Sequence, residues 1–166
     1  MKVAEAMSRD VRVANPNQSI YEAACIMAQM DAGVVPVAEN DRLVGMITDR
    51  DIAVRAVATG KGPNTLVREV MTPDLKYCFE DEDLSHVAKN MAEERVRRLP
   101  VMSRDKRLVG ILSVGYIART REKKAATEAL RGVSQHGGPH SRRRGPEFVP
   151  RCMHPFSSSR SSIPPQ

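Results

Sequence analysis

The sequence contains no tryptophan, and aromatic residues make up only 4% of its 166 residues. Its interior is therefore expected to consist of small aliphatic side chains and of its nine methionines. A surface of aromatic rings that stacks on nucleic-acid bases is not expected. The three cysteines, Cys25, Cys78 and Cys152, are odd in number and far apart, which fits neither a disulfide framework nor paired zinc ligands. We therefore expect a protein of the reducing cytoplasm.

Long apolar runs are also missing. No stretch approaches the roughly 20 apolar residues that cross a bilayer. The first residues carry the acid Glu5 and lack the apolar core of a leader peptide. With 41% hydrophobic residues, the chain is long enough for one medium domain or two small ones. The sequence predicts a soluble protein without membrane contact.

The formal net charge of +6 is concentrated at the C-terminal end. Residues 136–166 carry a net charge of +4, whereas residues 1–135 carry only +2. This end is rich in Ser, Pro, Arg and Gly, a composition that buries too little apolar surface to order itself. We therefore expect residues 135–166 to form a disordered basic tail. Its arginines at 142–144 would attract nucleic acid only nonspecifically, so nucleic acid is not expected as a partner.

An internal repeat organises the rest of the chain. Residues 4–58 align with residues 68–122 at a shift of 64, which becomes 65 after one inserted residue. The identities include Met7/Met71, Asp10/Asp74, Ala24/Ala88, Met27/Met91, Ala28/Ala92, Pro36/Pro100 and Val37/Val101, then 42–45 with 107–110 and 52–53 with 117–118. Such self-similarity predicts two copies of one structural unit. We expect the copies at 3–60 and 67–124, with a linker at 61–66.

Both copies predict the order helix, strand, strand, helix. Ser19 and Glu22 form a capping-box pattern before an apolar stripe of helical spacing, and Thr48 and Asp83 are also expected helix caps. Short β-branched runs predict the strands. The helices are expected after Ser19, over 50–58, over 83–94 and over 114–126, and the strands over 33–37, 43–47, 98–102 and 108–112. The expected fold class is α+β, an α/β sandwich.

These copies resemble the tandem cystathionine-β-synthase (CBS) domain pair. The motifs that carry the resemblance are residues 34–37 and 43–52 in the first copy and 97–101 and 108–113 in the second. The resemblance covers about residues 3–122 and implies two repeats packed about a pseudo-twofold axis. It is closest to the small stand-alone bacterial pairs that include the hypoxic response proteins.

Thr48 and Asp51 are the first candidate binding residues. A hydroxyl and free amides at a helix start can bind a phosphate, and a carboxylate three residues on can accept hydrogen bonds from a ribose diol. Gly45 allows a ligand or a neighbouring backbone to come close. Spacing alone favours a simpler interpretation, in which both are first-turn residues that suit the helix dipole. The resemblance favours binding, because in CBS pairs this threonine commonly contacts the phosphate, and this aspartate the ribose, of an adenine nucleotide between the repeats.

The resemblance also implies which residues hold the adenine. They are Val34 and Val35 on the strand before the proline, together with Lys76 and Tyr77 at the start of the other repeat. The alternative for the two valines is an ordinary core strand, and the alternative for Tyr77 is half-buried filler.

The equivalent position in the second copy departs from this pattern. Ser113 retains the hydroxyl, but Tyr116 stands where the carboxylate would be, and Arg97 and Arg98 add charge that suits a polyphosphate. In one interpretation, which we favour, Tyr116 fills an empty site and the arginines pair with acids such as the glutamates at 93–94. In the other, the site binds a more phosphorylated ligand without reading the sugar.

No arrangement of residues supports catalysis, so an enzyme is not expected. His86 is expected on the solvent side of a helix, and Cys25 is expected to pack among apolar neighbours. Cys78 lies at an expected strand edge and could be reactive, but no base is evident beside it. The acids at 80–83 lack the glycine turn and ligand spacing of a calcium loop, so no metal is expected.

Together these features predict a regulatory module. Its ligand would be AMP, ADP, ATP or a related adenosyl compound such as NAD or S-adenosylmethionine, bound as a regulator rather than as a required cofactor. Occupancy would change dimer geometry or affinity for an effector protein in trans. The resemblance implies a homodimer formed by the apolar faces of the helices after Thr48 and Ser113. The alternative is a ligand-free protein-interaction module with a closed cleft.

Overall fold

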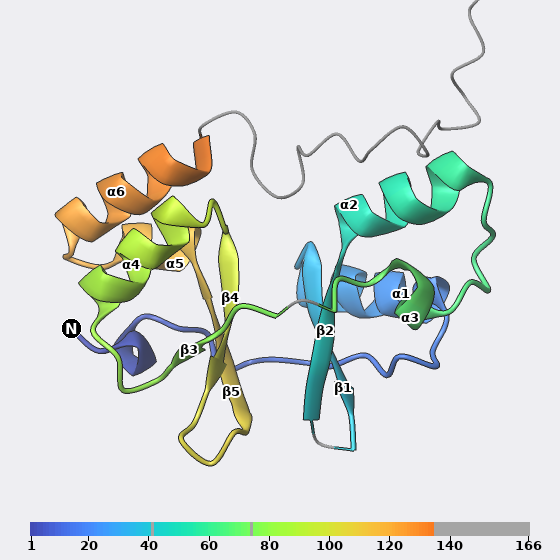
Figure 1. The fold of residues 1–166 in the computed structure, drawn as a ribbon, viewed down its shortest axis with the longest axis horizontal. Coiled ribbons are helices and arrows are strands. Elements are labelled where there is room, and N and C mark those ends of the chain that lie inside the picture. Colours follow the sequence, from blue (N-terminus) through green and yellow to red (C-terminus); the bar gives the residue numbers. More distant parts are fainter. Residues whose placement is uncertain (41, 74, 135–166) are drawn as a thin grey trace, which may run out of the picture.

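The computed structural model describes residues 1–40, 42–73 and 75–134. These residues form two halves that lie side by side, each with a small sheet and with helices packed around it (Figure 1). Each half has its own hydrophobic core. The tail expected over 135–166 lies outside the described residues.

The first half follows the predicted order of elements. Its α1 helix begins with the expected capping box, in which Ser19 Oγ accepts from the Glu22 amide at 3.2 Å and the Glu22 carboxylate accepts from the Ser19 amide at 2.8 Å. Strands β1 and β2 are antiparallel, with Val34 opposite Thr48. The elements are α1 (Ile20–Met30), β1 (Val34–Glu39), β2 (Arg42–Thr48), α2 (Asp49–Asp51), the π-helical turn η2 (Ile52–Ala56) and the 3-10 turn η3 (Val57–Thr59).

The second half repeats this plan with one strand more. Asp83 caps its first helix by accepting from the amides of Ser85 and His86 at 3.0 and 3.3 Å. Strand β3 runs parallel to β4, and β4 is antiparallel to β5 with Arg98 opposite Ser113. The elements are β3 (Cys78–Phe79), α4 (Leu84–Glu93), β4 (Arg98–Met102), β5 (Leu108–Ser113), α5 (Val114–Arg119) and α6 (Lys123–Ser134).

The prediction of a single helix over 114–126 is wrong. Helix α5 ends at Arg119, and α6 begins at Lys123 and continues to Ser134. The break lies at Thr120, whose hydroxyl donates to the Ile117 carbonyl at 2.7 Å and accepts from the Glu122 amide at 3.2 Å. A hydroxyl that bonds the local backbone in this way competes with the helical hydrogen-bond ladder. The chain then turns back, and α6 packs against α4.

Two short segments are exchanged between the halves. The segment 1–8 contains the turn η1 (Val3–Glu5), and its buried Val3 belongs to the core of the second half. The segment 66–73 contains the short helix α3 (Val67–Val70), which packs into the core of the first half. We call these two stretches the exchanged segments. The chain therefore crosses between the halves twice, before β1 and before β3 (Figure 1).

The exchanged segments obey the symmetry of the repeat. Thr72 pairs with Met46 on β2, and Ser8 pairs with Ile111 on β5, so each pair repeats the other at the shifts found in the sequence. The pairing residues lie beside glycines of β2 and β5. At Gly45 it is the backbone and side chain of the exchanged segment 66–73 that come close. Of the two possibilities raised for Gly45, the structure shows the neighbouring backbone.

Candidate functional site

Thr48 and Asp51 form a closed capping box at the end of β2. The Asp51 Oδ2 atom accepts from the Thr48 amide at 3.0 Å and from the Thr48 hydroxyl at 2.8 Å. The Asp51 amide donates in return to Thr48 Oγ1 at 3.0 Å. The simpler first-turn interpretation of this pair therefore describes its contacts in this structure.

Asp51 nevertheless differs from an ordinary cap, because its side chain is only 3% exposed. It is the one charged residue that is buried in the described part of the chain. Its Oδ1 atom lies 3.3 Å from Nε of Arg55, one turn further along. Arg55 also donates to the carbonyls of Val70 and Met71, at 2.9 and 3.0 Å. A buried carboxylate is costly unless it is paired, and Thr48 and Arg55 provide the partners.

Sequence reasoning missed Arg55. The residue lies four positions after Asp51, the spacing at which opposite charges on a helix meet, so the i,i+4 rule would have found it. Its contact with the exchanged segment 66–73 carries no such local signal.

Val34 and Val35 lie beside this pair as predicted, but their side chains are buried. Val34 is opposite Thr48 in the sheet, and the Gly33 carbonyl accepts from the Asp49 amide at 3.1 Å. Val35 belongs to the apolar core of the first half. These valines could reach a ligand only through their backbone.

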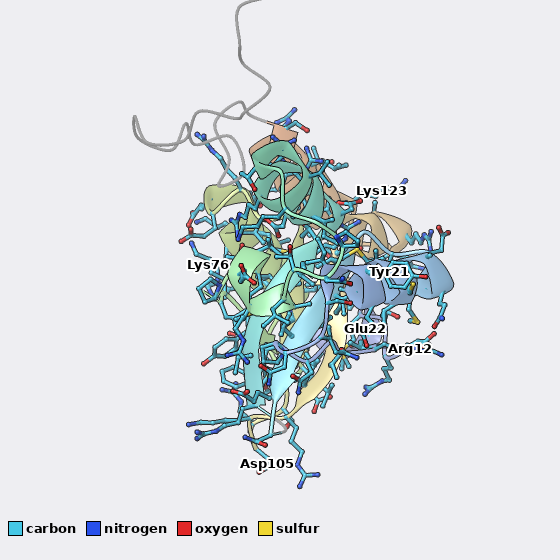
Figure 2. The ribbon with its side chains drawn as sticks, turned by 90° about the vertical axis from the view of Figure 1, so that its right-hand side faces the viewer. Arg12, Tyr21, Glu22, Lys76, Asp105 and Lys123 are labelled. Carbon is cyan, nitrogen blue, oxygen red and sulfur yellow. The ribbon has the colours of Figure 1, made fainter. Side chains whose placement is uncertain are left out.

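Lys76 and Tyr77 lie against the second half. Lys76 pairs with Glu94, and the ring of Tyr77 meets that of Phe79 edge to face at a centroid distance of 5.5 Å. Tyr77 is 52% exposed, and its ring contact is with Phe79 rather than with Thr48 or Asp51. Within residues 1–40, 42–73 and 75–134, no hydrogen bond or ion pair joins Lys76 or Tyr77 to Thr48 or Asp51. Figure 2 shows Lys76 on the face of the molecule opposite Tyr21.

No sequence pattern indicated the hollow that Lys76 and Tyr77 line. It has a volume of about 240 Å³ and lies between the start of β3, helix α4 and the start of β4. Apolar side chains form part of its wall, and the Lys76–Glu94 ion pair is at its rim. Residues that the sequence analysis did not propose as binding residues line it as well: Glu82, Val87, Asn90, Met91, Val96 and Leu99.

The second position keeps the hydroxyl cap but not the carboxylate. Ser113 Oγ accepts from the Tyr116 amide at 3.1 Å, and the guanidinium of Arg119 lies 5.8 Å from the centre of the Tyr116 ring. Arg98 is opposite Ser113 in the sheet, and the Arg97 carbonyl accepts from the Val114 amide at 3.1 Å.

The ion pairs expected for Arg97 and Arg98 are wrong. Glu94 pairs with Lys76, and Glu93 lies 3.9 Å from Lys89 on the preceding turn of α4. Both arginines are exposed and make no ion pair within the described ranges. The two glutamates nearest to them in sequence on α4 instead contact two lysines.

The other candidate residues do not form a reactive site. Cys78 lies on the edge strand β3, as expected, but burial, with the nearby charge of Glu82, raises the pKa of its thiol to about 12. Such a thiol carries almost no thiolate at neutral pH, so the expectation that it could be reactive is wrong. Cys25 is half-buried on α1, and His86 is exposed beside Asn90.

The acids at 80–83 have structural partners. Arg104 lies 2.9 Å from Asp81 and lowers the pKa of that carboxyl, and Asp83 caps α4. Among the residues the structure places, no three His, Cys, Asp or Glu side chains are arranged to hold a metal ion. None of the helices in that part of the chain combines the length and apolar character that crossing a membrane requires.

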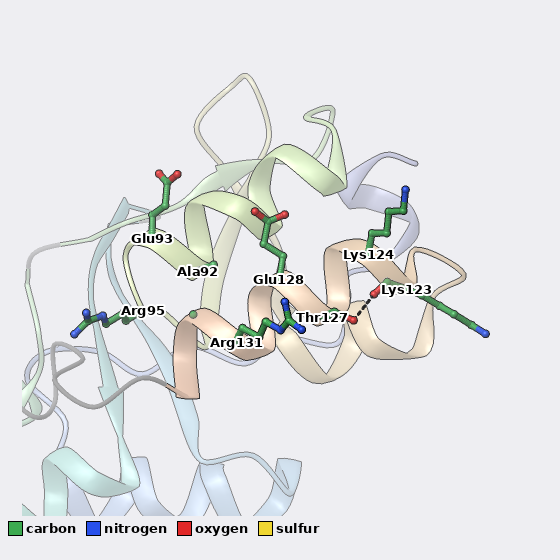
Figure 3. A pocket seen from close by; sticks show the side chains of 9 residues that line it. Ala92, Glu93, Arg95, Lys123, Lys124, Thr127, Glu128 and Arg131 are labelled. Carbon is green, nitrogen blue, oxygen red and sulfur yellow. Dashed lines mark hydrogen bonds between the residues drawn. The ribbon is translucent and has the colours of Figure 1, made fainter.

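A larger groove of about 680 Å³ lies between α4 and α6 (Figure 3). Its lining mixes charges of both signs, and the labelled side chains point in different directions rather than toward one centre. Thr127 in this wall donates its hydroxyl to the Lys123 carbonyl at 2.8 Å. A binding site usually gathers a few polar groups around an apolar pocket, so this groove is a weaker candidate than Thr48 and Asp51.

The structure is a tandem pair of α/β repeats. Each repeat has a hydroxyl-capped strand end and an exchanged segment, and the strands of the two repeats pair at equivalent residues. The CBS domain model matches residues 3–57 and 67–123. The chain therefore belongs to the CBS domain family, as the sequence motifs indicated.

Relatives of similar length support this membership. The chain is 38% identical over 133 residues to the CBS domain-containing protein YhcV of Bacillus subtilis. The matched region covers 80% of this chain and 94% of that protein. It is 32% identical over 131 residues to hypoxic response protein 1 of Mycobacterium tuberculosis, covering 78% and 91%. The expected similarity to hypoxic response proteins is confirmed.

Solved structures share the fold. The CBS domain pair of protein MJ0100, solved in complex with 5'-methylthioadenosine and S-adenosyl-L-methionine, is 33% identical with a TM-score of 0.67, covering 75% of this chain and 98% of that one. Hypoxic response protein I, solved with two coordinated zinc ions, is 34% identical with a TM-score of 0.64, covering 72% and 98%.

Proposed function

We propose that this protein is a regulatory module that binds an adenosine-containing ligand at Thr48 and Asp51. Occupancy then changes how its dimer or an effector protein responds in trans, in the reducing cytoplasm. The ligand class is supported by the related MJ0100 pair, whose solved complex holds two adenosyl compounds. AMP, ADP, ATP and NAD share the same adenosine group and belong to the same class of candidates.

The buried carboxylate of Asp51 carries this proposal. Burying a charge is costly, so a charged side chain that is 3% exposed beside a hydroxyl cap calls for a reason, and ligand binding supplies one in this proposal. A carboxylate accepts two hydrogen bonds from a vicinal diol, which is the group that distinguishes ribose. Tyr116 offers no such acceptor at the equivalent position, so the two halves of the pair differ in what they can read.

The adenine would be held by the backbone of Val34 and Val35, with Lys76 and Tyr77 on the opposite wall. The role of Lys76 and Tyr77 is inferred from the family resemblance. The ion pair of Lys76 with Glu94 would have to open or shift to admit a base there.

The second position takes a phosphate group rather than a ribose in this proposal. Arg97 and Arg98 are exposed beside Ser113 and have no acidic partner in the portion of the chain that is described. This observation favours the second of the two sequence interpretations. Guanidinium groups bind phosphate through paired hydrogen bonds, so a polyphosphate would gain most from them.

Calorimetric titration with AMP, ATP, NAD and S-adenosylmethionine tests the proposal. We expect at least one to bind the wild type and to bind Asp51→Asn about tenfold or more weakly, because the diol loses a charged acceptor. Asn keeps the size of Asp51 and can still accept from Thr48. Asp83→Asn is the matched control, since it alters a helix-capping aspartate at a distant place and should leave binding unchanged.

Absence of binding by all four compounds at millimolar concentration would contradict the proposal. It would favour the alternative of a ligand-free protein-interaction module, for which the closed box of Thr48 and Asp51 would be the permanent state.

A further inference from the structure

The guanidinium of Arg55 joins the buried carboxylate to the exchanged segment 66–73. It touches Asp51 through Nε and the carbonyls of Val70 and Met71 through one terminal nitrogen. These two carbonyls end α3, where backbone acceptors are left without helical partners. One residue later, Thr72 exchanges two hydrogen bonds with Met46 on β2, at 2.8 and 3.0 Å.

This connection exists in only one half of the molecule. The residue equivalent to Arg55 is Thr120, whose hydroxyl bonds the local backbone instead. The equivalent of the Thr72 pairing is Ser8 with Ile111, which exchanges two bonds of 2.9 Å without an arginine behind it. Arg55 also lies in the π-helical turn η2, and π-turns occur frequently at functional sites.

We infer that Arg55 couples the Thr48 and Asp51 site to the exchanged segment 66–73, so that a ligand at Asp51 loosens the hold of this segment on the first half. The direction of the effect follows from the capacity of the carboxylate. A carboxylate has about four acceptor positions. Thr48 donates two hydrogen bonds to Oδ2, and Oδ1 forms the ion pair with Arg55 at 3.3 Å.

A diol at Asp51 would donate to the free acceptor positions, which lie on Oδ1, the oxygen that Arg55 faces. The diol then competes with Arg55 for this oxygen, and Arg55 makes the longest of the three contacts, 3.3 Å against 3.0 and 2.8 Å. Once it leaves Asp51, the guanidinium is no longer oriented toward the Val70 and Met71 carbonyls. The segment it held leads directly into the second half, so a change at the ligand site reaches the contact between the repeats.

Hydrogen exchange in the ligand-free protein gives the first test, and it does not depend on the proposed function. In Arg55→Ala we expect the amides of Thr72 and Met46 to exchange about tenfold to a hundredfold faster, the range that corresponds to losing hydrogen bonds from a charged donor. The amides of Ser8 and Ile111 should be unchanged. Arg55→Lys keeps the charge but not the planar fork, and should give a smaller acceleration at the same two amides.

The outcomes separate clearly. No acceleration at Thr72, or equal acceleration at Ile111, would overturn the coupling, because the second result indicates general destabilisation. A second hydrogen-exchange experiment, which rests on the proposed function, measures the same amides with saturating AMP or S-adenosylmethionine. A bound ligand should speed exchange at Thr72 in the wild type and add nothing in Arg55→Ala, whereas slower exchange at Thr72 in the wild type would refute the inference. If neither compound binds, the proposed function fails while the Arg55 variants still test the link.

Discussion

Two glycines, Gly45 and Gly110, occupy equivalent positions against the exchanged segments. Substituting alanine should lower the free energy of unfolding by a different amount at each. A methyl group on Gly110 would lie 2.7 Å from the Ser8 carbonyl oxygen and 2.6 Å from the Met7 sulfur. On Gly45 it would lie 3.1 Å from the Thr72 carbonyl oxygen and 2.8 Å from the Met71 sulfur. A methionine side chain can move aside more readily than a backbone carbonyl in a bridge.

The magnitudes follow from two opposing terms. Alanine in a strand is favoured over glycine by about 0.5–1 kcal/mol. Overpacking costs about 1–3 kcal/mol. At Gly110 the backbone overlap should place the cost near the middle of that range, about 2 kcal/mol, for a net loss of about 1–1.5 kcal/mol in the free energy of unfolding. At Gly45 the carbonyl needs to move by only a few tenths of an ångström, which places the cost at about 1 kcal/mol, so we expect a net loss of about 0–0.5 kcal/mol.

Urea unfolding followed by circular dichroism measures this difference as a shift of the midpoint at constant slope. Gly62→Ala is the control, because no atom lies within 4 Å of the added methyl group, and it should be neutral or stabilising by about 0.4–1 kcal/mol. Equal losses at Gly45 and Gly110, or a larger loss at Gly45, would refute the packing argument.

Two further predictions concern the second half. Cys78 should resist alkylation at pH 8 in the native protein while Cys25 reacts, because its raised pKa keeps the buried thiol protonated; rapid labelling of Cys78 would contradict its burial. Since the folded pKa of about 12 exceeds the ordinary value of 9.0, this thiol's contribution to stability is complete below pH 9 and declines above it. Gly132→Ala should detach α6 from α4, because the methyl group would overlap the Ala92 backbone, and proteolysis should then cut α6 faster. Gly115→Ala is its control, with only an ordinary contact of 3.6 Å.

Local patterns explain why much of the fold was predictable. The capping of helices by Ser19, Thr48 and Asp83 depends on residues two or three positions away, which the sequence displays directly. The break at Thr120 is also local, yet it was missed. A threonine bonds its own backbone only in some helices, and the apolar spacing continued past it.

The candidate site was predictable only in part. Thr48 and Asp51 are three residues apart, so their meeting follows from helix geometry. The placing of Lys76 was expected from the family, but its pairing with Glu94 depends on how α4 packs, and so does the isolation of Arg97 and Arg98. Charged pairs between elements are set by the packing of those elements, which neither periodicity nor spacing reveals.

By itself, the sequence determined the two copies, the order of their helices and strands and the family, because repeats, caps and apolar periodicity are encoded in neighbouring residues. Only the tertiary structure decided that the segments 1–8 and 66–73 pack on the other half and that Cys78 is buried. It also decided that Arg55 links Asp51 to Val70, which lies 15 residues after Arg55 in the sequence. The physical reason is that each of these depends on which apolar surfaces are buried together. Burial between residues distant in the chain is settled when the two cores close, not by any single stretch of sequence.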